Sequence, residues 1–164
     1  MRLFIAIQLS EEMRQAIVKV QDAFVRRGIR GNYTPKENLH LTLAFIGEYP
    51  DAEPVLEVLE SVPVEPFTLT LGGIGAFGAL WWIGLERSEA LTSYVRALRH
   101  ALAEAGIPFD GKRFSPHITM LRRASVKGGR LPAIELERVS MLADRASLMR
   151  SDRGKHGMIY TEIR

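Results

Sequence analysis

Hydrophobic positions along the chain follow two different periods, which together predict an α+β protein. Apolar runs rich in β-branched and aromatic residues predict strands. These runs cover residues 2–9, 39–48, 67–71, 80–85, 115–122, 136–142, 146–149 and 158–163. Apolar residues at helical spacing predict two long helices that begin after Ser10 and Ser88, and a shorter helix over 51–61. The Gly-rich segment 72–78 is predicted as a loop, and the polar segment 151–157 as a turn.

Local signals mark both ends of the two long helices. Ser10 and Ser88 are suited to cap the first turns, because a serine hydroxyl accepts a hydrogen bond from a free backbone N–H. Gly28 and Gly106 follow the last apolar positions and predict the helix ends. Residues 34–37, Thr-Pro-Lys-Glu, match a capping box and predict one further helical turn with the proline at its first position.

The order of predicted elements occurs twice. In each half a strand leads into a long helix closed by glycine, then an irregular connection, then a strand that begins His-apolar-Thr-apolar. Outside these two motifs the halves share little residue identity. The pattern predicts a single bilobal domain over residues 1–164, with two pseudo-symmetric antiparallel sheet lobes, outer helices and a central cleft. A quasi-twofold relation would bring His40 and His117 together in that cleft.

The paired motif is the main candidate for chemistry. His40-Leu41-Thr42-Leu43 and His117-Ile118-Thr119-Met120 lie 77 residues apart. Side chains alternate in a strand, so each histidine shares a face with the threonine two residues later, while the apolar residues enter the core. One such histidine alone is more often structural. Two imidazoles that face one cleft can act as general acid and general base, because their pKa of about 6.5 lies close to the working pH.

Composition narrows the chemistry further. There is no cysteine among the 164 residues, which excludes disulfides, thiolate nucleophiles, zinc knuckles and iron–sulfur clusters. The chain has four histidines and no His-Glu-x-x-His motif, so we expect no metal site. The apolar start of the chain is interrupted at Gln8, Ser10 and Glu11, too early for a membrane span or a signal peptide. We therefore expect a cytoplasmic protein that does not bind membranes.

Charge is distributed unevenly along the chain. Residues 1–82 carry 7 Lys and Arg against 10 Asp and Glu, whereas residues 83–164 carry 15 against 9. Residues 111–134, which surround the second motif, contain no acidic residue. The basic residues of that segment are Lys112, Arg113, Arg122, Arg123, Lys127 and Arg130. Cations beside acid–base candidates favour an anionic substrate, with phosphate first, although a solvated basic face is the alternative.

The segments from His40 to Gly47 and from Ser115 to Arg122 resemble the paired signature of the two-histidine phosphoesterases. Within that superfamily the chain resembles the bacterial and archaeal RNA 2′,3′-cyclic phosphodiesterases, long named 2′-5′ RNA ligases. The resemblance implies a bilobal fold and activity with no metal and no nucleotide cofactor. It assigns His40 as the proton donor and His117 as the proton acceptor. It also implies that Thr42, Thr119 and Arg122 contact phosphate oxygens.

This family activity is hydrolysis of RNA 2′,3′-cyclic phosphate ends to 2′-phosphates, with weak reversible 2′-5′ ligation at the same site. The expected partner is RNA with such an end, or a small nucleotide. We expect a monomer with no obligate protein partner. Two alternatives stay open: a phosphodiesterase for small cyclic nucleotides such as ADP-ribose cyclic phosphate, and an RNA-binding module with degenerate catalytic strands.

Strand alternation also gives expectations for residues near the motifs. It places Phe45 on the core side, and it gives Arg122 the parity opposite to that of His117 if the strand is regular. It sends Trp81 and Trp82 to opposite faces, one into the core and the other free to stack on a base. The sequence assigns no catalytic role to Arg123, His100 and His156, and His100 is expected on the solvent face of its helix.

Overall fold

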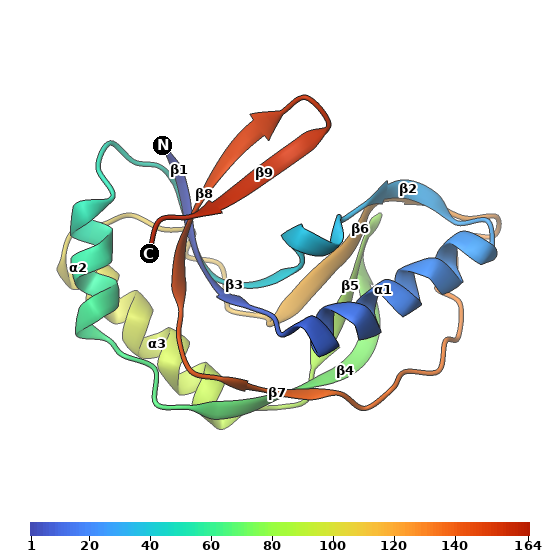
Figure 1. The fold of residues 1–164 in the computed structure, drawn as a ribbon, viewed down its shortest axis with the longest axis horizontal. Helices are drawn as coiled ribbons and strands as arrows, with labels where there is room; N and C mark the ends of the chain where they lie inside the picture. Colours follow the sequence, from blue (N-terminus) through green and yellow to red (C-terminus); the bar gives the residue numbers. More distant parts are fainter.

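Two antiparallel sheets form the framework of the protein, and α-helices pack against their outer faces (Figure 1). The computed structural model describes all 164 residues. The first sheet has the strand order β3-β1-β8-β9, and the second has the order β2-β6-β5-β4-β7. This arrangement confirms the predicted bilobal α+β fold.

Nine strands and three α-helices make up the two lobes, together with one short 3-10 helix. The strands are β1 (Arg2–Gln8), β2 (Arg30–Tyr33), β3 (His40–Glu48), β4 (Phe67–Phe77), β5 (Leu80–Leu85), β6 (His117–Ser125), β7 (Ser140–Ala143), β8 (Ser147–Gly154) and β9 (Gly157–Glu162). The helices are α1 (Glu11–Arg26), α2 (Glu53–Ser61), α3 (Glu89–Glu104) and the 3-10 helix η1 (Lys36–Asn38).

The two long helices are exchanged between the lobes. Helix α1 follows β1 of the first sheet but packs against β6 of the second sheet. Helix α3 follows β5 of the second sheet but packs against β3 of the first. In Figure 1, α1 accordingly lies beside β2 and β6, whereas α2 and α3 lie on the opposite side of the molecule. Each histidine strand is therefore backed by the helix from the other half of the repeat.

The ends of α1 and α3 match the sequence signals. Ser10 Oγ accepts a hydrogen bond from the Met13 N–H at 3.2 Å, and Ser88 Oγ accepts one from the Leu91 N–H at 3.1 Å. Gly28 has a φ angle of 76° and Gly106 one of 73°. The left-handed backbone at both glycines lets the next residue donate back to the last helical turn. Both predicted caps and both predicted helix ends are confirmed.

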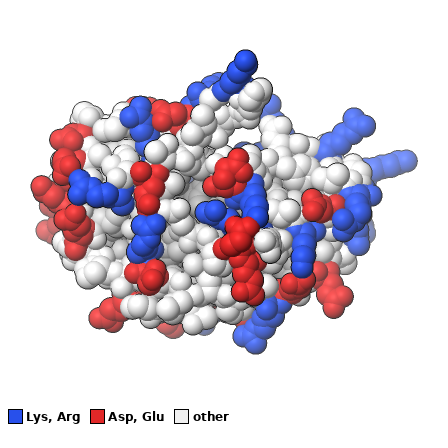
Figure 2. All heavy atoms as spheres, in the orientation of Figure 1, with Lys and Arg blue, Asp and Glu red and all other residues white.

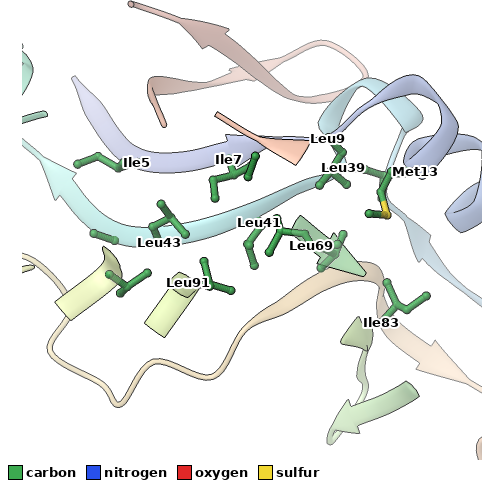
Figure 3. Close-up of a cluster of buried hydrophobic side chains, with 14 of the residues drawn as sticks. Ile5, Ile7, Leu9, Met13, Leu39, Leu41, Leu43, Leu69, Ile83 and Leu91 are labelled. Atoms are coloured by element: carbon green, nitrogen blue, oxygen red, sulfur yellow. The ribbon is translucent and has the colours of Figure 1, made fainter. Parts of the chain in front are cut away.

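One continuous hydrophobic core of 34 buried residues joins the two sheets. Figure 3 shows its central part, where Leu41 and Leu43 of β3 meet Leu91 of α3. The opposite face of the first sheet carries a smaller cluster of Phe4, Ala6 and Met149. Strand alternation in β1 thus sends one set of side chains to the helices and the other set to the far face of the sheet.

The glycine-rich segment is part of a strand, so the predicted loop over 72–78 is wrong. Strand β4 continues to Phe77 and pairs with β5, with one irregularity between Leu71 and Ile74. A Cβ atom on Gly75 would overlap the Trp82 ring on the neighbouring strand. Glycine is present here because a large ring packs against the backbone, which is a packing requirement and not a turn.

Other boundaries also differ from the predictions. The polar segment 151–157 continues β8 and begins β9, so only two residues form the turn between them. The strand predicted over 136–142 is short and begins at Ser140. The sequence does not predict strand β2, because its exposed polar residues show no apolar alternation. The helical turn after Pro35 is a 3-10 turn with no side-chain cap, so the predicted capping box is wrong.

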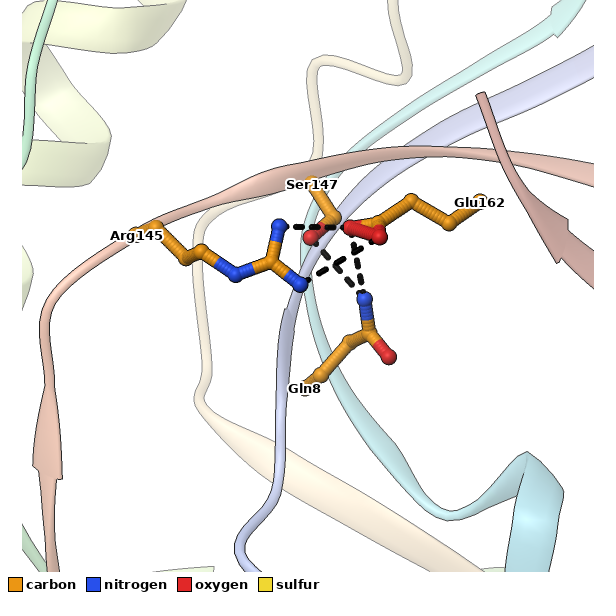
Figure 4. Close-up of polar contacts among 4 residues, drawn as sticks. All are labelled: Gln8, Arg145, Ser147 and Glu162. Atoms are coloured by element: carbon orange, nitrogen blue, oxygen red, sulfur yellow. Dashed lines mark hydrogen bonds and ion pairs between the residues drawn. The ribbon is translucent and has the colours of Figure 1, made fainter. Parts of the chain in front are cut away.

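A polar cluster fastens the C-terminal strand to the first sheet (Figure 4). Arg145 donates two hydrogen bonds to the Glu162 carboxylate, at 2.7 and 3.3 Å. Gln8 Nε2 donates to Glu162 at 2.8 Å and to the buried Ser147 hydroxyl at 3.0 Å. The hydrogen bonds from Arg145 and Ser147 lower the pKa of Glu162.

No helix of the protein is both long enough and apolar enough to cross a membrane.

Candidate active site

A large cleft between the two sheets contains both motif histidines. Its volume is about 1350 Å³, and residues from β1, β3, β6 and β8 line it. The five residues singled out from the sequence all lie on its wall: His40, Thr42, His117, Thr119 and Arg122. The fold therefore brings together side chains that lie 77 residues apart in the sequence.

The two histidines are held in the same way. His40 Nδ1–H donates to the Asn38 carbonyl at 2.7 Å, and His117 Nδ1–H donates to the Ser115 carbonyl at 2.7 Å. A carbonyl only accepts hydrogen bonds, so each contact keeps the proton of the neutral ring on Nδ1. The lone pair is then on Nε2, the atom available for proton transfer. His40 Nε2 also accepts a hydrogen bond from the Thr42 hydroxyl at 2.8 Å.

Aromatic rings surround each imidazole. The Tyr160 ring meets His40 edge-on with centroids 5.3 Å apart, and the Phe4 ring lies 4.9 Å from the same histidine. In the other lobe the Phe77 ring meets His117 edge-on at 5.1 Å, and Trp82 lies 6.3 Å from it. These contacts restrict ring rotation and leave each histidine half-buried.

Burial lowers the pKa of His40 below its usual value. The nearby positive charge of Arg122 and the imidazole of His117 act in the same direction, while the hydrogen bond to the Asn38 carbonyl opposes them. These surroundings make His40 more readily neutral than a free histidine. A bound anion would act in the opposite direction, since a negative charge next to the ring favours the imidazolium.

Both histidine strands contain a β-bulge at the same position. In β3, Leu43 has no partner, because β1 pairs with the residues on either side of it. In β6, Met120 has no partner on β5 for the same reason. The extra residue reverses the alternation of side chains beyond it. The fifth residue after each histidine, Phe45 in β3 and Arg122 in β6, consequently faces the cleft.

These bulges change two expectations. The placement of Phe45 on the core side is wrong, because its ring is half-buried on the cleft wall with the Arg2 guanidinium 4.8 Å above it. Arg122 reaches the cleft, which simple alternation from His117 would not allow. The two lobes thus present different side chains at equivalent positions, a flat apolar ring in one and a cation in the other.

Basic residues predominate along the cleft. Figure 2 shows Lys and Arg side chains gathered at the β2–β6 end of the molecule, whereas basic and acidic side chains are mixed over the middle of the face in view. The cations on the cleft wall are Arg2, Arg99, Lys112, Arg113, Arg122, Arg150 and Arg153, against the acids Glu48, Asp110 and Asp152. Half of the basic residues in segment 111–134 line the cleft. The other three, Arg123, Lys127 and Arg130, do not.

Several residues around the site were not identified from the sequence. Asn38 and Ser115 act through their backbone carbonyls, which leave no side-chain signal. The Asn38 side chain is buried, and its Nδ2 donates to the Met158 carbonyl of β9 at 2.9 Å. Phe77 is 49% exposed and lines the cleft, a location hidden by the loop predicted around it.

The remaining residues of interest lie outside the cleft. Trp81 is buried against Phe24, and Trp82 occupies the opposite face of β5, which confirms the predicted division. Trp82 packs against Phe77 on the side away from the cleft wall, with its ring 6.3 Å from that of His117, and does not line the cleft. The structure holds no cluster of three or more His, Cys, Asp or Glu side chains that could bind a metal ion. Away from the site, His100 is exposed on α3, and His156 is exposed in the β8–β9 turn.

Comparison with known proteins indicates the same superfamily as the paired motifs. The sequence profile of the 2′-5′ RNA ligase superfamily matches residues 8–155. An RNA 2′,3′-cyclic phosphodiesterase of Escherichia coli K12 is 36% identical over 129 residues, which cover 76% of this chain and 73% of that protein. An RNA 2′,3′-cyclic phosphodiesterase of Thermus thermophilus is 33% identical, and the match covers 99% of this chain and 88% of that protein.

Solved structures show the same fold. TT0787 of Thermus thermophilus superposes with a TM-score of 0.83 and 32% identity, covering 100% of this chain and 96% of that one. Escherichia coli LigT complexed with 3′-AMP superposes with a TM-score of 0.80 and 28% identity, covering 99% and 94%. The fold and the paired histidine strands define a two-lobed phosphoesterase architecture. The chain belongs to the 2′-5′ RNA ligase superfamily.

Proposed function

We propose that this protein hydrolyses RNA 2′,3′-cyclic phosphate ends to 2′-phosphates by metal-independent acid–base catalysis. The main support is the pair of equivalent histidines on one cleft, each with Nδ1–H donating to a backbone carbonyl, which leaves the lone pair for proton transfer on Nε2. The relatives named RNA 2′,3′-cyclic phosphodiesterase support the same activity.

In this mechanism the cyclic phosphate lies between the two lobes. His117 Nε2 takes a proton from a water molecule, whose oxygen forms a bond to phosphorus. The bond from phosphorus to O3′ breaks, and His40 Nε2–H donates its proton to the departing oxygen. The product carries a 2′-phosphate and a free 3′-hydroxyl. A water entering opposite the leaving oxygen needs its base and acid on opposite sides of phosphorus, which suits histidines from opposing lobes.

The other polar groups of the cleft hold the phosphate. The hydroxyls of Thr42 and Thr119 would donate hydrogen bonds to the non-bridging oxygens, and Arg122 would balance the charge that develops on them. The negative charge of the substrate counters the burial that lowers the pKa of His40. Substrate binding thereby favours the protonated His40 that the mechanism requires.

Ligation uses the same groups. The 5′-hydroxyl of a second RNA can take the place of water and attack phosphorus, which yields a 2′-5′ linkage when the bond to O3′ breaks. Water at about 55 M favours hydrolysis by mass action. We therefore propose that ligation is weak and becomes measurable only at high concentrations of RNA ends.

The test is product analysis with a short RNA that ends in a 2′,3′-cyclic phosphate, in the presence of EDTA. We expect a 2′-monophosphate end, and a fall in kcat of about 10²- to 10⁴-fold for His40→Ala and for His117→Ala. His100→Ala is the matched control, since this exposed histidine lies outside the cleft and should leave the rate unchanged.

Three results would contradict the proposal: no turnover, turnover only after metal is added, or a 3′-monophosphate product. A parallel reaction with ADP-ribose cyclic phosphate separates the second candidate function. Faster turnover of that small substrate than of the RNA would favour a phosphodiesterase of small nucleotides. Full RNA binding without any turnover, unchanged by either alanine substitution, would instead indicate a binding module.

A further inference from the structure

The carbonyl of each bulged residue is held by a helix side chain that reaches it from outside the sheet. Gln21 of α1 donates from Nε2 to the Met120 carbonyl at 2.9 Å and to the Thr34 carbonyl at 3.0 Å. Arg99 of α3 donates from Nε and Nη2 to the Leu43 carbonyl at 3.2 and 3.1 Å. Two unrelated side chains thus make the same contact in the two lobes.

The position of Gln21 is unusual for a polar residue. It is only 6% exposed and lies one helical turn after Ile17, on the buried stripe of α1. A buried amide is costly unless it is hydrogen-bonded, and an apolar residue would pack there without that requirement. The Thr34 N–H also donates to the Met120 carbonyl, at 2.9 Å, so two donors fix this one oxygen.

The place of the bulge decides where Arg122 points. With the extra residue at Met120, the side chain of Arg122 faces the cleft together with His117 and Thr119. Without the bulge, or with the extra residue placed beyond Arg122, alternation would turn the guanidinium toward the core side. Arg122 is exposed on the cleft wall, so the strand that carries it determines the direction of its side chain.

We propose that Gln21 is a positioning residue of the active site. By fixing the bulge at Met120 it keeps the Arg122 guanidinium directed into the cleft, where it binds the phosphate of the substrate. This role rests on the function proposed above, because it assumes that Arg122 contacts phosphate.

The experiment measures binding of inorganic phosphate by titration calorimetry, with Gln21→Met, Arg122→Met and the double variant. Each single substitution is expected to weaken phosphate binding roughly tenfold, the scale of one lost hydrogen bond to a charged group. The double variant should bind no more than about twofold more weakly than Arg122→Met, because both changes act through one guanidinium. Gln15→Met is the matched control, since Gln15 is exposed on α1 and bonds only to Glu11.

Kinetics provide a second measurement. Gln21→Met should change KM and kcat for the cyclic phosphate in the same proportion as Arg122→Met, a split between the two constants that the shared guanidinium determines. A residue that only supports the fold would lower the melting temperature without this split. If Gln21→Met does not fold, Gln21→Glu takes its place at neutral pH, because it keeps the shape and removes the N–H donors.

Two results would overturn the inference: a folded Gln21 variant that binds phosphate within twofold of the wild type, or additive losses in the double variant. Absence of phosphate binding by the wild-type protein would overturn it as well. The proposed hydrolase function is judged separately, by the 2′-phosphate product and the histidine variants.

Discussion

Substitution of Gly75 by alanine offers a sharp test of how the second lobe supports His117. A Cβ atom at this position would overlap three atoms of the Trp82 ring. Trp82 has little freedom to move, because its ring also packs against Phe77, with centroids 5.3 Å apart, and against the Gly84 backbone. Overpacking of this kind costs about 1–3 kcal/mol.

Gly73→Ala is the matched control, because it lies in the same strand and its added Cβ would meet no atom within 4 Å. Gly73→Ala should stabilise the fold by up to about 1 kcal/mol, since it reduces the freedom of the unfolded chain. Urea unfolding should therefore separate the two variants by about 1–4 kcal/mol, and each kcal/mol shifts Tm by about 2–4 °C in a protein of this size.

Activity gives the second half of this prediction. Trp82 lies 6.3 Å from the His117 ring, so a displaced indole should also displace the proposed base. We expect Gly75→Ala to lower kcat at a temperature where the variant is fully folded, and Gly73→Ala to leave it unchanged. The reasoning is refuted if the two alanine variants have equal stability, or if Gly75→Ala is destabilised but keeps the full kcat.

Three further predictions concern charge and hydrogen bonding. Burial is the main cause that lowers the pKa of His40, and the charge of Arg122 adds to it; Arg122→Met should therefore move the alkaline limb of the kcat/KM profile to higher pH, and an unmoved limb would contradict this. Thr42→Val should lower kcat roughly tenfold by removing the hydroxyl bonded to His40, a change read from single-turnover rates. The Arg145 hydrogen bond lowers the pKa of Glu162 in the folded protein, so the ionised carboxylate stabilises the fold. This contribution to the free energy of unfolding is complete above the unfolded pKa of about 4.3, and it is lost as the pH falls through the folded pKa. Glu162→Gln should accordingly cost about 1 kcal/mol or less at pH 7 and nothing near pH 2 by thermal unfolding; an equal cost at both pH values would refute the assignment.

The histidine pair can be found from the sequence because its information is local. A strand period of two fixes the relation of His40 to Thr42 and of His117 to Thr119, and the bulges begin only after these residues. The helix caps are equally local, since a serine and a glycine at the right offsets determine them. These features need no knowledge of neighbouring strands.

The side chains beyond the bulges cannot be placed in this way. Phe45 and Arg122 face the cleft because an unpaired residue precedes them, and strand pairing and helix contacts from distant segments determine which residue is unpaired. The loop predicted for the glycine-rich part of β4 is wrong for a similar reason. Glycine composition fits both a loop and a backbone covered by a ring, and only the position of Trp82 distinguishes them.

Because α1 packs against β6 and α3 packs against β3, each half of the molecule depends on the other for the burial of its long helix. No single cut between the repeats would release a half that keeps both its sheet and the helix behind it. A half-length fragment would expose the apolar stripe of its own helix, and two complementary fragments would have to assemble before either became stable. An ancestor of half this length could have buried the apolar stripe of its helix by packing that helix against the sheet of a second copy. This is the symmetric exchange that domain swapping produces.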